Sequence, residues 1–288
     1  MLPVRLALAL SLLPVMGCCQ SLLGTKEPYP PEMLANHIQA RKASYGDGWT
    51  VLAAPPFVVI GDGLPTDVRL DAEEVVAVAA RKLKAAYFER DPPVIVDVLM
   101  LKDDASYDRI AGTILGPPST PYGFYTTCED KIYVNLTNGN GTLVHEMVHA
   151  FMAANFPDCP VWFNEGLGSL YEQPDLAADP IRGKPNWRLP ALQDAIRAQK
   201  TIPLEDLLSL SRWDYTAKKR VGLTYAMSRY LLYYLQEKGL LQTFYRRFVD
   251  SQSQDPTGLL TLKSVLGITD LRAFQREWES ATLQLTFP

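Results

Sequence analysis

The chain has 288 residues, of which 47% are hydrophobic and 21% charged, and its formal net charge is −4. This length suffices for one large domain or two smaller lobes, and the composition is that of a folded globular protein. The net charge is slightly negative and no basic block stands out. We therefore do not expect the chain to bind nucleic acid.

The N-terminus differs from the rest of the chain. Residues 1–17 carry one cation, Arg5, followed by an apolar run that is too short for a membrane span. They are expected to form a secretory signal peptide. The run ends in Val15-Met16-Gly17-Cys18, which resembles a bacterial lipobox and predicts lipidation at Cys18. The alternative is plain secretion, so the protein is expected to be lipid-anchored to the bacterial cell envelope, or otherwise periplasmic or secreted.

Two cysteines remain outside this N-terminal segment, Cys128 and Cys159. In an oxidising compartment such a pair is a candidate disulfide, and the two residues lie on either side of a segment rich in histidine. The alternative is two free, buried thiols.

The first half of the mature chain predicts alternating strands and helices. Residues 18–50 are rich in Pro, Gly and polar residues and are expected to form a tether and an irregular lead-in. Strands are expected at 57–60, 94–101, 122–126 and 131–136, and helices at 71–90 and 103–114.

From Thr142 onward the sequence predicts almost only helices. The layout is therefore α+β, with one domain over 51–288. Its first lobe, 51–172, is mixed α/β and its second lobe, 173–288, is helical.

The most informative motif is His145-Glu146-Met147-Val148-His149. On a helix, side chains four positions apart are neighbours, so both imidazoles face one point, which is the arrangement that a single zinc ion needs. Glu146 lies on an adjacent face, where it can reach a water on the metal without binding the metal itself.

A catalytic zinc site needs a third protein ligand, and Glu165 is the candidate. It belongs to Asn164-Glu165-Gly166 on a second short helix, which is expected after Pro160. Glu172 lies two helical turns further on the same face, where it can accept a hydrogen bond from a ligand histidine. Asn164 is expected to have a similar supporting role next to the metal ligands.

The alternative for these residues is an ordinary solvated helix face. The neighbours Leu143, Val144, Met147, Val148 and Phe151 are apolar, however, which predicts a buried helix. Two buried histidines and a buried glutamate without a partner would be unfavourable. The combined motif therefore favours a metal site over chance.

The segments His145–His149 and Asn164–Glu172 resemble the gluzincin zinc metallopeptidases, in particular peptidase MA-like proteins and M1-type aminopeptidases. The spacer between them is slightly shorter than in the best-known members, and Gly168 stands where alanine is common. The resemblance implies one zinc ion and a peptidase fold whose cleft lies between an α/β lobe and a helical lobe.

The resemblance also implies an edge strand that binds the peptide substrate by strand addition. Either 122–126, with Gly123 and Tyr125, or 131–136 is placed to be this strand. No Gly-Ala-Met-Glu-Asn run occurs, which argues against a true M1-type aminopeptidase.

Such enzymes often use a tyrosine or a histidine from the helical lobe to stabilise the oxyanion, and the only histidine outside the motif, His37, lies near the N-terminus, which favours a tyrosine. Tyr225, 60 residues after Glu165, has the separation that the resemblance implies, and Tyr230 and Tyr215 are the alternatives. Arg229, one turn after Tyr225, is expected to bind a substrate carboxylate.

The sequence thus predicts an exported zinc metallopeptidase that acts on a peptide or protein, with Glu146 as general base. Two alternatives remain: a zinc-bearing but inactive binding or assembly lipoprotein on the same fold, and a structural lipoprotein whose motif is accidental.

Overall fold

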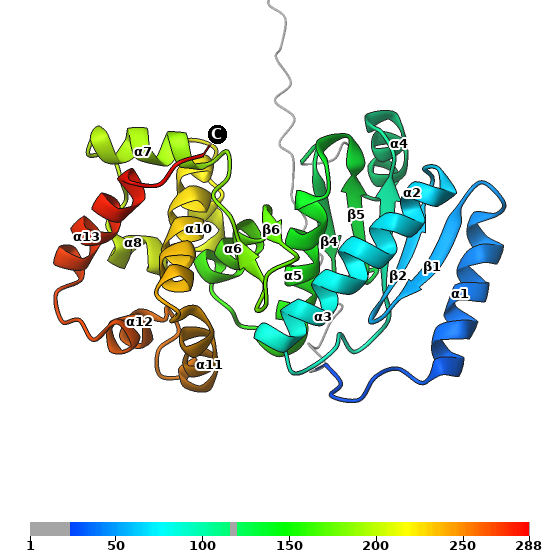
Figure 1. The fold of residues 1–288 in the computed structure, drawn as a ribbon, viewed down its shortest axis with the longest axis horizontal. Coiled ribbons are helices and arrows are strands. Elements are labelled where there is room, and N and C mark those ends of the chain that lie inside the picture. The colour runs from blue at the N-terminus through cyan, green and yellow to red at the C-terminus, as the bar shows by residue number, and fades with distance from the viewer. Residues whose placement is uncertain (1–23, 116–119, 288) are drawn as a thin grey trace, which may run out of the picture.

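The structure is a computed structural model that describes residues 24–115 and 120–287 (Figure 1). The predicted signal peptide and Cys18 lie outside these ranges. In the part of the chain that is described, no helix combines the length and the apolar character needed to cross a membrane.

A five-stranded mixed sheet forms the N-terminal part. Its strands lie in the order β1 (Thr50–Ala54), β2 (Phe57–Gly61), β3 (Val96–Leu101), β5 (Lys131–Asn135) and β4 (Gly123–Thr126). The three inner strands are parallel to one another, whereas β1 and β4 are antiparallel edge strands. Strands β2 and β3 are buried along their whole length, which explains their continuous apolar sequences.

Helices cover both faces of this sheet. Phe57 and Val59 of β2 pack in one core with α3 (Ala77–Ala86) and α5 (Gly141–Asn155). Alternate residues point to the opposite face, where α1 (Pro31–Tyr45) and α4 (Asp104–Leu115) lie. The alternation follows from the two-residue period of a strand.

Helix α1 corrects the predicted irregular lead-in over 18–50. It begins at Pro31, a favourable first-turn residue, and ends at Tyr45, with Gly46 as its C-cap. None of its residues is fully buried, although Leu34, Ile38 and Tyr45 pack, partly buried, against the core of the sheet. Two ion pairs also attach it to the sheet: Asp97 of β3 is 2.7 Å from Nε2 of His37 and 2.6 Å from Nε of Arg41.

The helix predicted over 71–90 exists but is displaced. It begins earlier, at Pro65, with α2 (Pro65–Leu70), passes through a π-helical turn, η1 (Asp71–Val76), and ends with α3 at Ala86. The other predicted strands and helices of the first half occur within a few residues of their expected ends, whereas α1 and β1 were missed.

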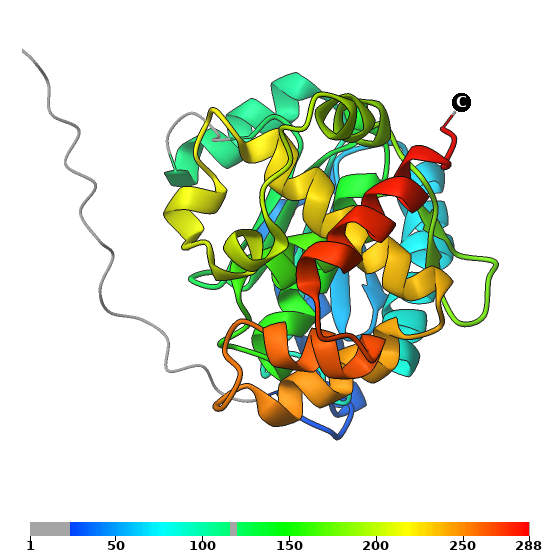
Figure 2. The same ribbon diagram turned by 90° about the vertical axis from the view of Figure 1, so that its left-hand side faces the viewer.

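The second half is helical, apart from the short strands β6 (Pro174–Asp175) and β7 (Arg182–Gly183). Its helices are α7 (Leu189–Arg197), α8 (Leu204–Ser209), α9 (Arg212–Tyr215), α10 (Val221–Glu237), α11 (Leu241–Ser251), α12 (Leu259–Leu266) and α13 (Leu271–Leu283). Figure 2 views the molecule from this side, with α10 and α13 in front of the sheet. The architecture is α+β, as predicted.

Helix α6 (Val161–Leu170) joins the two halves. It packs against α5 on one side and along α10 on the other (Figure 1). Trp162 and Phe163 of α6 also contact Phe244 and Phe248 of α11. One hydrophobic core therefore runs from the sheet into the helical half, and α5 and α6 lie at its centre.

Candidate metal centre

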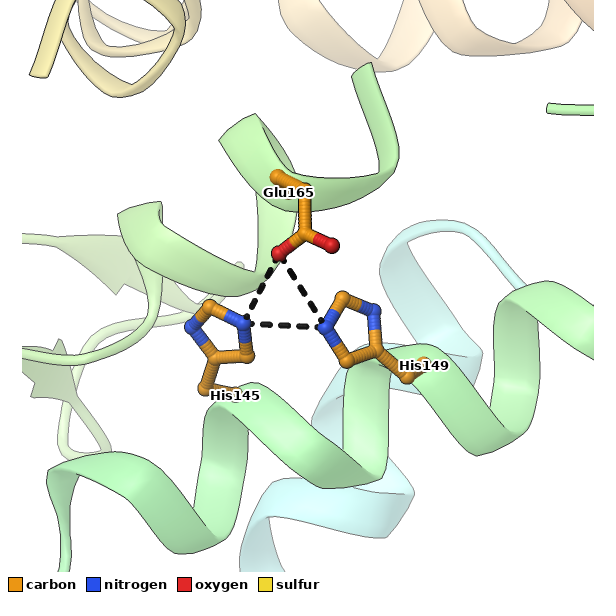
Figure 3. A group of neighbouring side chains, drawn as sticks. All are labelled: His145, His149 and Glu165. Atoms are coloured by element: carbon orange, nitrogen blue, oxygen red, sulfur yellow. Dashed lines mark hydrogen bonds and ion pairs between the residues drawn. The ribbon is translucent and has the colours of Figure 1, made fainter. Parts of the chain in front are cut away.

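Helices α5 and α6 bring three metal-ligating side chains to one point (Figure 3). Nε2 of His145 is 2.9 Å from Nε2 of His149, and Oε2 of Glu165 is 3.5 Å from each of these nitrogens. The histidines come from successive turns of α5. Pro157 and Pro160 redirect the chain after α5, so that α6 returns alongside it.

These three distances fit a zinc ion. Ligand atoms about 2.0 Å from a tetrahedral zinc lie about 3.3 Å from one another. The observed separations of 2.9 Å and 3.5 Å lie on either side of that value. Two histidines and one glutamate are also a donor set typical of catalytic zinc, which keeps a fourth position for water or substrate.

The supporting hydrogen bonds determine which histidine nitrogens carry protons. Nδ1 of His149 lies 2.7 Å from Oδ1 of Asn164, and Nδ1 of His145 lies 3.4 Å from Oε1 of Glu172. Each Nδ1–H donates to its oxygen, which leaves both Nε2 lone pairs directed at the same point. Two lone pairs and a carboxylate oxygen repel one another unless a cation lies between them. Asn164 and Glu172 thus each lie beside the Nδ1 atom of one of the two histidines.

Burial and the charged neighbours shift the pKa values of these groups in opposite directions, and the neighbours prevail. Burial alone lowers the pKa of His145, but hydrogen bonds to Glu165 and Glu172 outweigh it and raise the pKa to about 10. Burial alone raises the pKa of Glu165, yet the two histidines hold it well below its usual range. The site is thus built to hold positive charge beside an ionised carboxylate.

Glu172 is fixed by a network that extends beyond α6. Arg188 donates to both of its carboxylate oxygens, at 2.8 Å and 2.6 Å, and the Asn186 amide donates to Oε2 at 3.0 Å. Burial alone raises the pKa of Glu172, but these contacts with Arg188 lower it to about 2. An ionised Glu172 is the form that accepts the Nδ1–H of His145.

Glu146 projects into the same cavity without belonging to the metal-ligating group. It is buried, and burial raises its pKa although the backbone N–H of Tyr125 donates a hydrogen bond to it. A carboxylate with a raised pKa is a better proton acceptor near neutral pH, which suits a general base.

A cavity of about 1140 Å³ opens over the three ligands. Edge strand β4 forms one wall, with Gly123 and Tyr125, and the helical half forms the opposite wall, with Arg188, Arg212 and Tyr225. Of the two segments that the sequence offered as edge strand, 122–126 contains it, because 131–135 is the inner strand β5.

Tyr225 lies beside Glu165 in this cavity. Burial raises its pKa, and the negative charge of Glu165 and a hydrogen bond to it raise the pKa further. The alternatives Tyr215 and Tyr230 are both fully buried, and their hydroxyls donate to the carbonyl oxygens of Thr224 and Asn186. Of the three candidates, only Tyr225 lines the cavity.

The prediction that Arg229 binds substrate is wrong. Its side chain is fully buried beneath α6, where it donates to the carbonyl oxygens of Leu170 and Lys184 and lies over the ring of Tyr230. Burial lowers its pKa to about 10. A guanidinium in this position braces the chain that follows α6 and does not reach the cavity.

The predicted disulfide is also wrong, because Cys128 and Cys159 are both free. Cys128 is exposed in the turn between β4 and β5, whereas Cys159 packs against the main core before α6. Burial raises the pKa of the Cys159 thiol well above its usual range, which keeps it protonated.

Sequence reasoning missed Asn186, Arg188 and Arg212. The first two lie in an irregular segment before α7, and no spacing rule connects them to Glu172. Arg212 belongs to the short helix α9, and its Nη1 is 3.3 Å from Oε1 of Glu165. No local sequence signal marks any of the three.

Comparisons with known proteins add little to this geometry. No family model and no curated protein matches the chain. Among solved structures it is similar to yeast LTA4 hydrolase in complex with Bestatin, with 17% identity and a TM-score of 0.47. The match covers 84% of this chain and 40% of that one, so the chain spans well under half of its length. A similarity this low does not assign a function. The fold and the site define an α+β protein with a candidate His–His–Glu metal centre.

Proposed function

We propose that this chain is a zinc-dependent peptidase that hydrolyses peptide bonds in the cavity over His145, His149 and Glu165. One observation carries the proposal. The oriented Nε2 atoms and the Glu165 oxygen converge on one point, and the buried carboxylate of Glu146 lies in the same cavity. A metal site that also holds a general base beside an open cavity is suited to hydrolysis. The resemblance of the two helical segments to gluzincins supports the same reaction.

A zinc ion held there would supply Lewis-acid polarisation of the scissile carbonyl and would acidify a bound water. The roles of the side chains follow from their positions. Glu146 accepts the proton of the attacking water and passes it to the leaving amine. Tyr225, across the cavity, donates a hydrogen bond to the carbonyl oxygen as negative charge develops on it.

The edge strand gives the substrate its orientation. Strand β4 is the last strand of the sheet and borders the cavity, so an extended peptide can lie antiparallel or parallel to it as a further strand. At Gly123, an added Cβ would be 2.5 Å from the Tyr133 carbonyl oxygen and 2.9 Å from Thr142. Glycine thus permits β4 to lie close to α5 and places the strand beside Glu146.

Export and lipidation at Cys18 complete the proposal. They rest on the signal peptide and the lipobox-like sequence, and they place the cavity outside the cytoplasm.

Glu146→Gln tests the reaction. The zinc-loaded variant and wild type are incubated with a diverse peptide library, and the products are identified by mass spectrometry. We expect the variant to keep its zinc and to lose about 10²–10⁴-fold in rate, because an amide of the same shape cannot accept the proton. Glu205→Gln, an exposed change on α8, is the matched control and should leave the rate unchanged.

Three outcomes distinguish the peptidase hypothesis from its alternatives. Cleavage by Glu146→Gln at the wild-type rate would assign the chemistry to another residue. Stoichiometric zinc in a wild-type protein that cleaves nothing would favour the inactive binding or assembly protein. Absence of zinc, with the same content in His149→Ala, would remove the metal assignment itself.

A further inference from the structure

The acidic residues of the cavity are all engaged by the site itself. Its lining contains three carboxylates among the described residues, Glu146, Glu165 and Glu172. Glu165 faces both histidines, Glu172 is held by Arg188 and Asn186, and Glu146 is the proposed general base. A substrate with a free N-terminal ammonium would need a carboxylate acceptor, and the lining leaves none for it.

The opposite wall carries positive charge. The guanidinium of Arg212 lines the cavity, its side chain is 65% exposed, and it contacts Glu165 through Nη1. Its remaining N–H groups are thus available to a ligand.

Three more cations adjoin this wall in the sequence. Lys218, Lys219 and Arg220 are exposed and immediately precede Val221 and Gly222, which line the cavity. Within 24–115 and 120–287, no carboxylate pairs with any of the three. In a chain of net charge −4, this is a local concentration of unneutralised positive charge at a cavity mouth.

We propose that the site takes acidic peptides, which it binds within their length rather than by a free N-terminus. This inference rests on the proposed peptidase function and names its substrate class. Carboxylates of the peptide, from Asp or Glu side chains or from its C-terminus, lie along α9 and the start of α10. There, guanidinium and ammonium groups hold them and raise the rate of encounter.

A membrane surface is the competing partner for this segment. Trp213 beside Arg212 is 78% exposed, and an exposed tryptophan among cations also suits anionic lipid headgroups. The peptide is favoured because Arg212, Val221 and Gly222 face the cavity itself, where a bilayer does not reach.

The test measures binding, so that it does not depend on hydrolysis. Zinc-loaded Glu146→Gln is titrated calorimetrically with peptides of equal length, acetylated and amidated, that carry glutamate, glutamine or lysine. We expect the glutamate peptide to bind about tenfold more tightly than the glutamine peptide, with the advantage shrinking at high salt. The lysine peptide should bind most weakly, and freeing the N-terminus should leave affinity within about twofold.

Substitution of the three cations tests whether they cause the preference for the glutamate peptide. Lys218→Gln/Lys219→Gln/Arg220→Gln should lose most of the preference for glutamate while keeping its zinc content and melting temperature. Arg246→Gln/Arg247→Gln/Arg276→Gln removes as many exposed cations from α11 and α13 and should retain the preference.

Equal affinity for the glutamate and glutamine peptides would overturn the inference, and so would a strong requirement for a free N-terminus. Loss of binding to phosphatidylglycerol vesicles in the first triple variant, with the peptide preference intact, would assign the cations to a membrane. Preferential binding of acidic peptides without cleavage by wild type would uphold the charge inference and remove the peptidase function.

Discussion

Gly168 on α6 lies so close to the ring of His145 that a larger residue at this position should disturb the metal centre. A Cβ added at this position would lie 2.8 Å from both Cδ2 and Nε2 of His145, whereas ordinary contact begins at 3.4 Å. In Gly168→Ala the ring must therefore retreat by about 3.4 − 2.8 = 0.6 Å, and zinc–ligand distances tolerate only about ±0.2 Å.

Displacing a ligand histidine in this way should weaken zinc binding by about 10–100-fold, the range seen when orienting contacts are lost. Competition with a chromophoric chelator measures this affinity, and circular dichroism of the metal-free protein checks the fold. Gly222→Ala is the matched control, since a Cβ there has no neighbour within 4 Å although Gly222 also lines the cavity. Zinc affinity in Gly168→Ala equal to that of the control would refute the geometric reasoning.

Three further changes test other parts of the site. Tyr225→Phe should keep zinc and fold but lose about 10²–10³-fold in kcat on a cleaved peptide, whereas Tyr233→Phe on the same helix should not. Equal kcat values for the two variants would show that Tyr225 only packs. Asn164→Ala removes the acceptor of the His149 Nδ1–H and should weaken zinc binding about 10–100-fold in the chelator assay; unchanged affinity would show that the contact does not orient the ring. Cys18→Ser should move the protein out of the membrane fraction, and identical fractionation of the two forms would leave plain secretion.

Local sequence patterns were sufficient for the centre of the site. His145 and His149 lie four positions apart on a helix with apolar neighbours, so burial and convergence followed from helical geometry alone. Glu172 lies seven positions after Glu165, and the structure places it beside His145. Helix α6 ends at Leu170 rather than at Glu172 as predicted, so the pitch of one helix accounts for the two histidines, whereas Glu172 reaches His145 from the turn after α6.

The same reasoning failed for residues and helices whose positions depend on tertiary contacts. Arg229 follows Tyr225 by one helical turn, which puts both on one side of α10. Only the first turns of α10 reach the cavity, however, and further along α6 covers the helix and buries Arg229. Helix α1 was missed for a related reason, since it is held by ion pairs to the buried Asp97 and by a few apolar residues that are only partly buried. Neither a covering helix nor a distant ion-pair partner leaves a local pattern in the sequence.

The position of Tyr225 depends on close packing between α6 and α10. A Cβ added at Gly166 would be 3.1 Å from Cβ of Ser228 and 3.2 Å from Cδ1 of Leu232, so glycine permits the two helices to approach closely. Ser228 lies one turn after Tyr225, and Gly166 directly follows Glu165. The contact that brings the helices together thus also sets the separation between the proposed oxyanion donor and the third metal ligand. The helical half is for this reason part of the site: α5 and α6 present the three ligands, and α10 adds the hydroxyl of Tyr225 to the cavity.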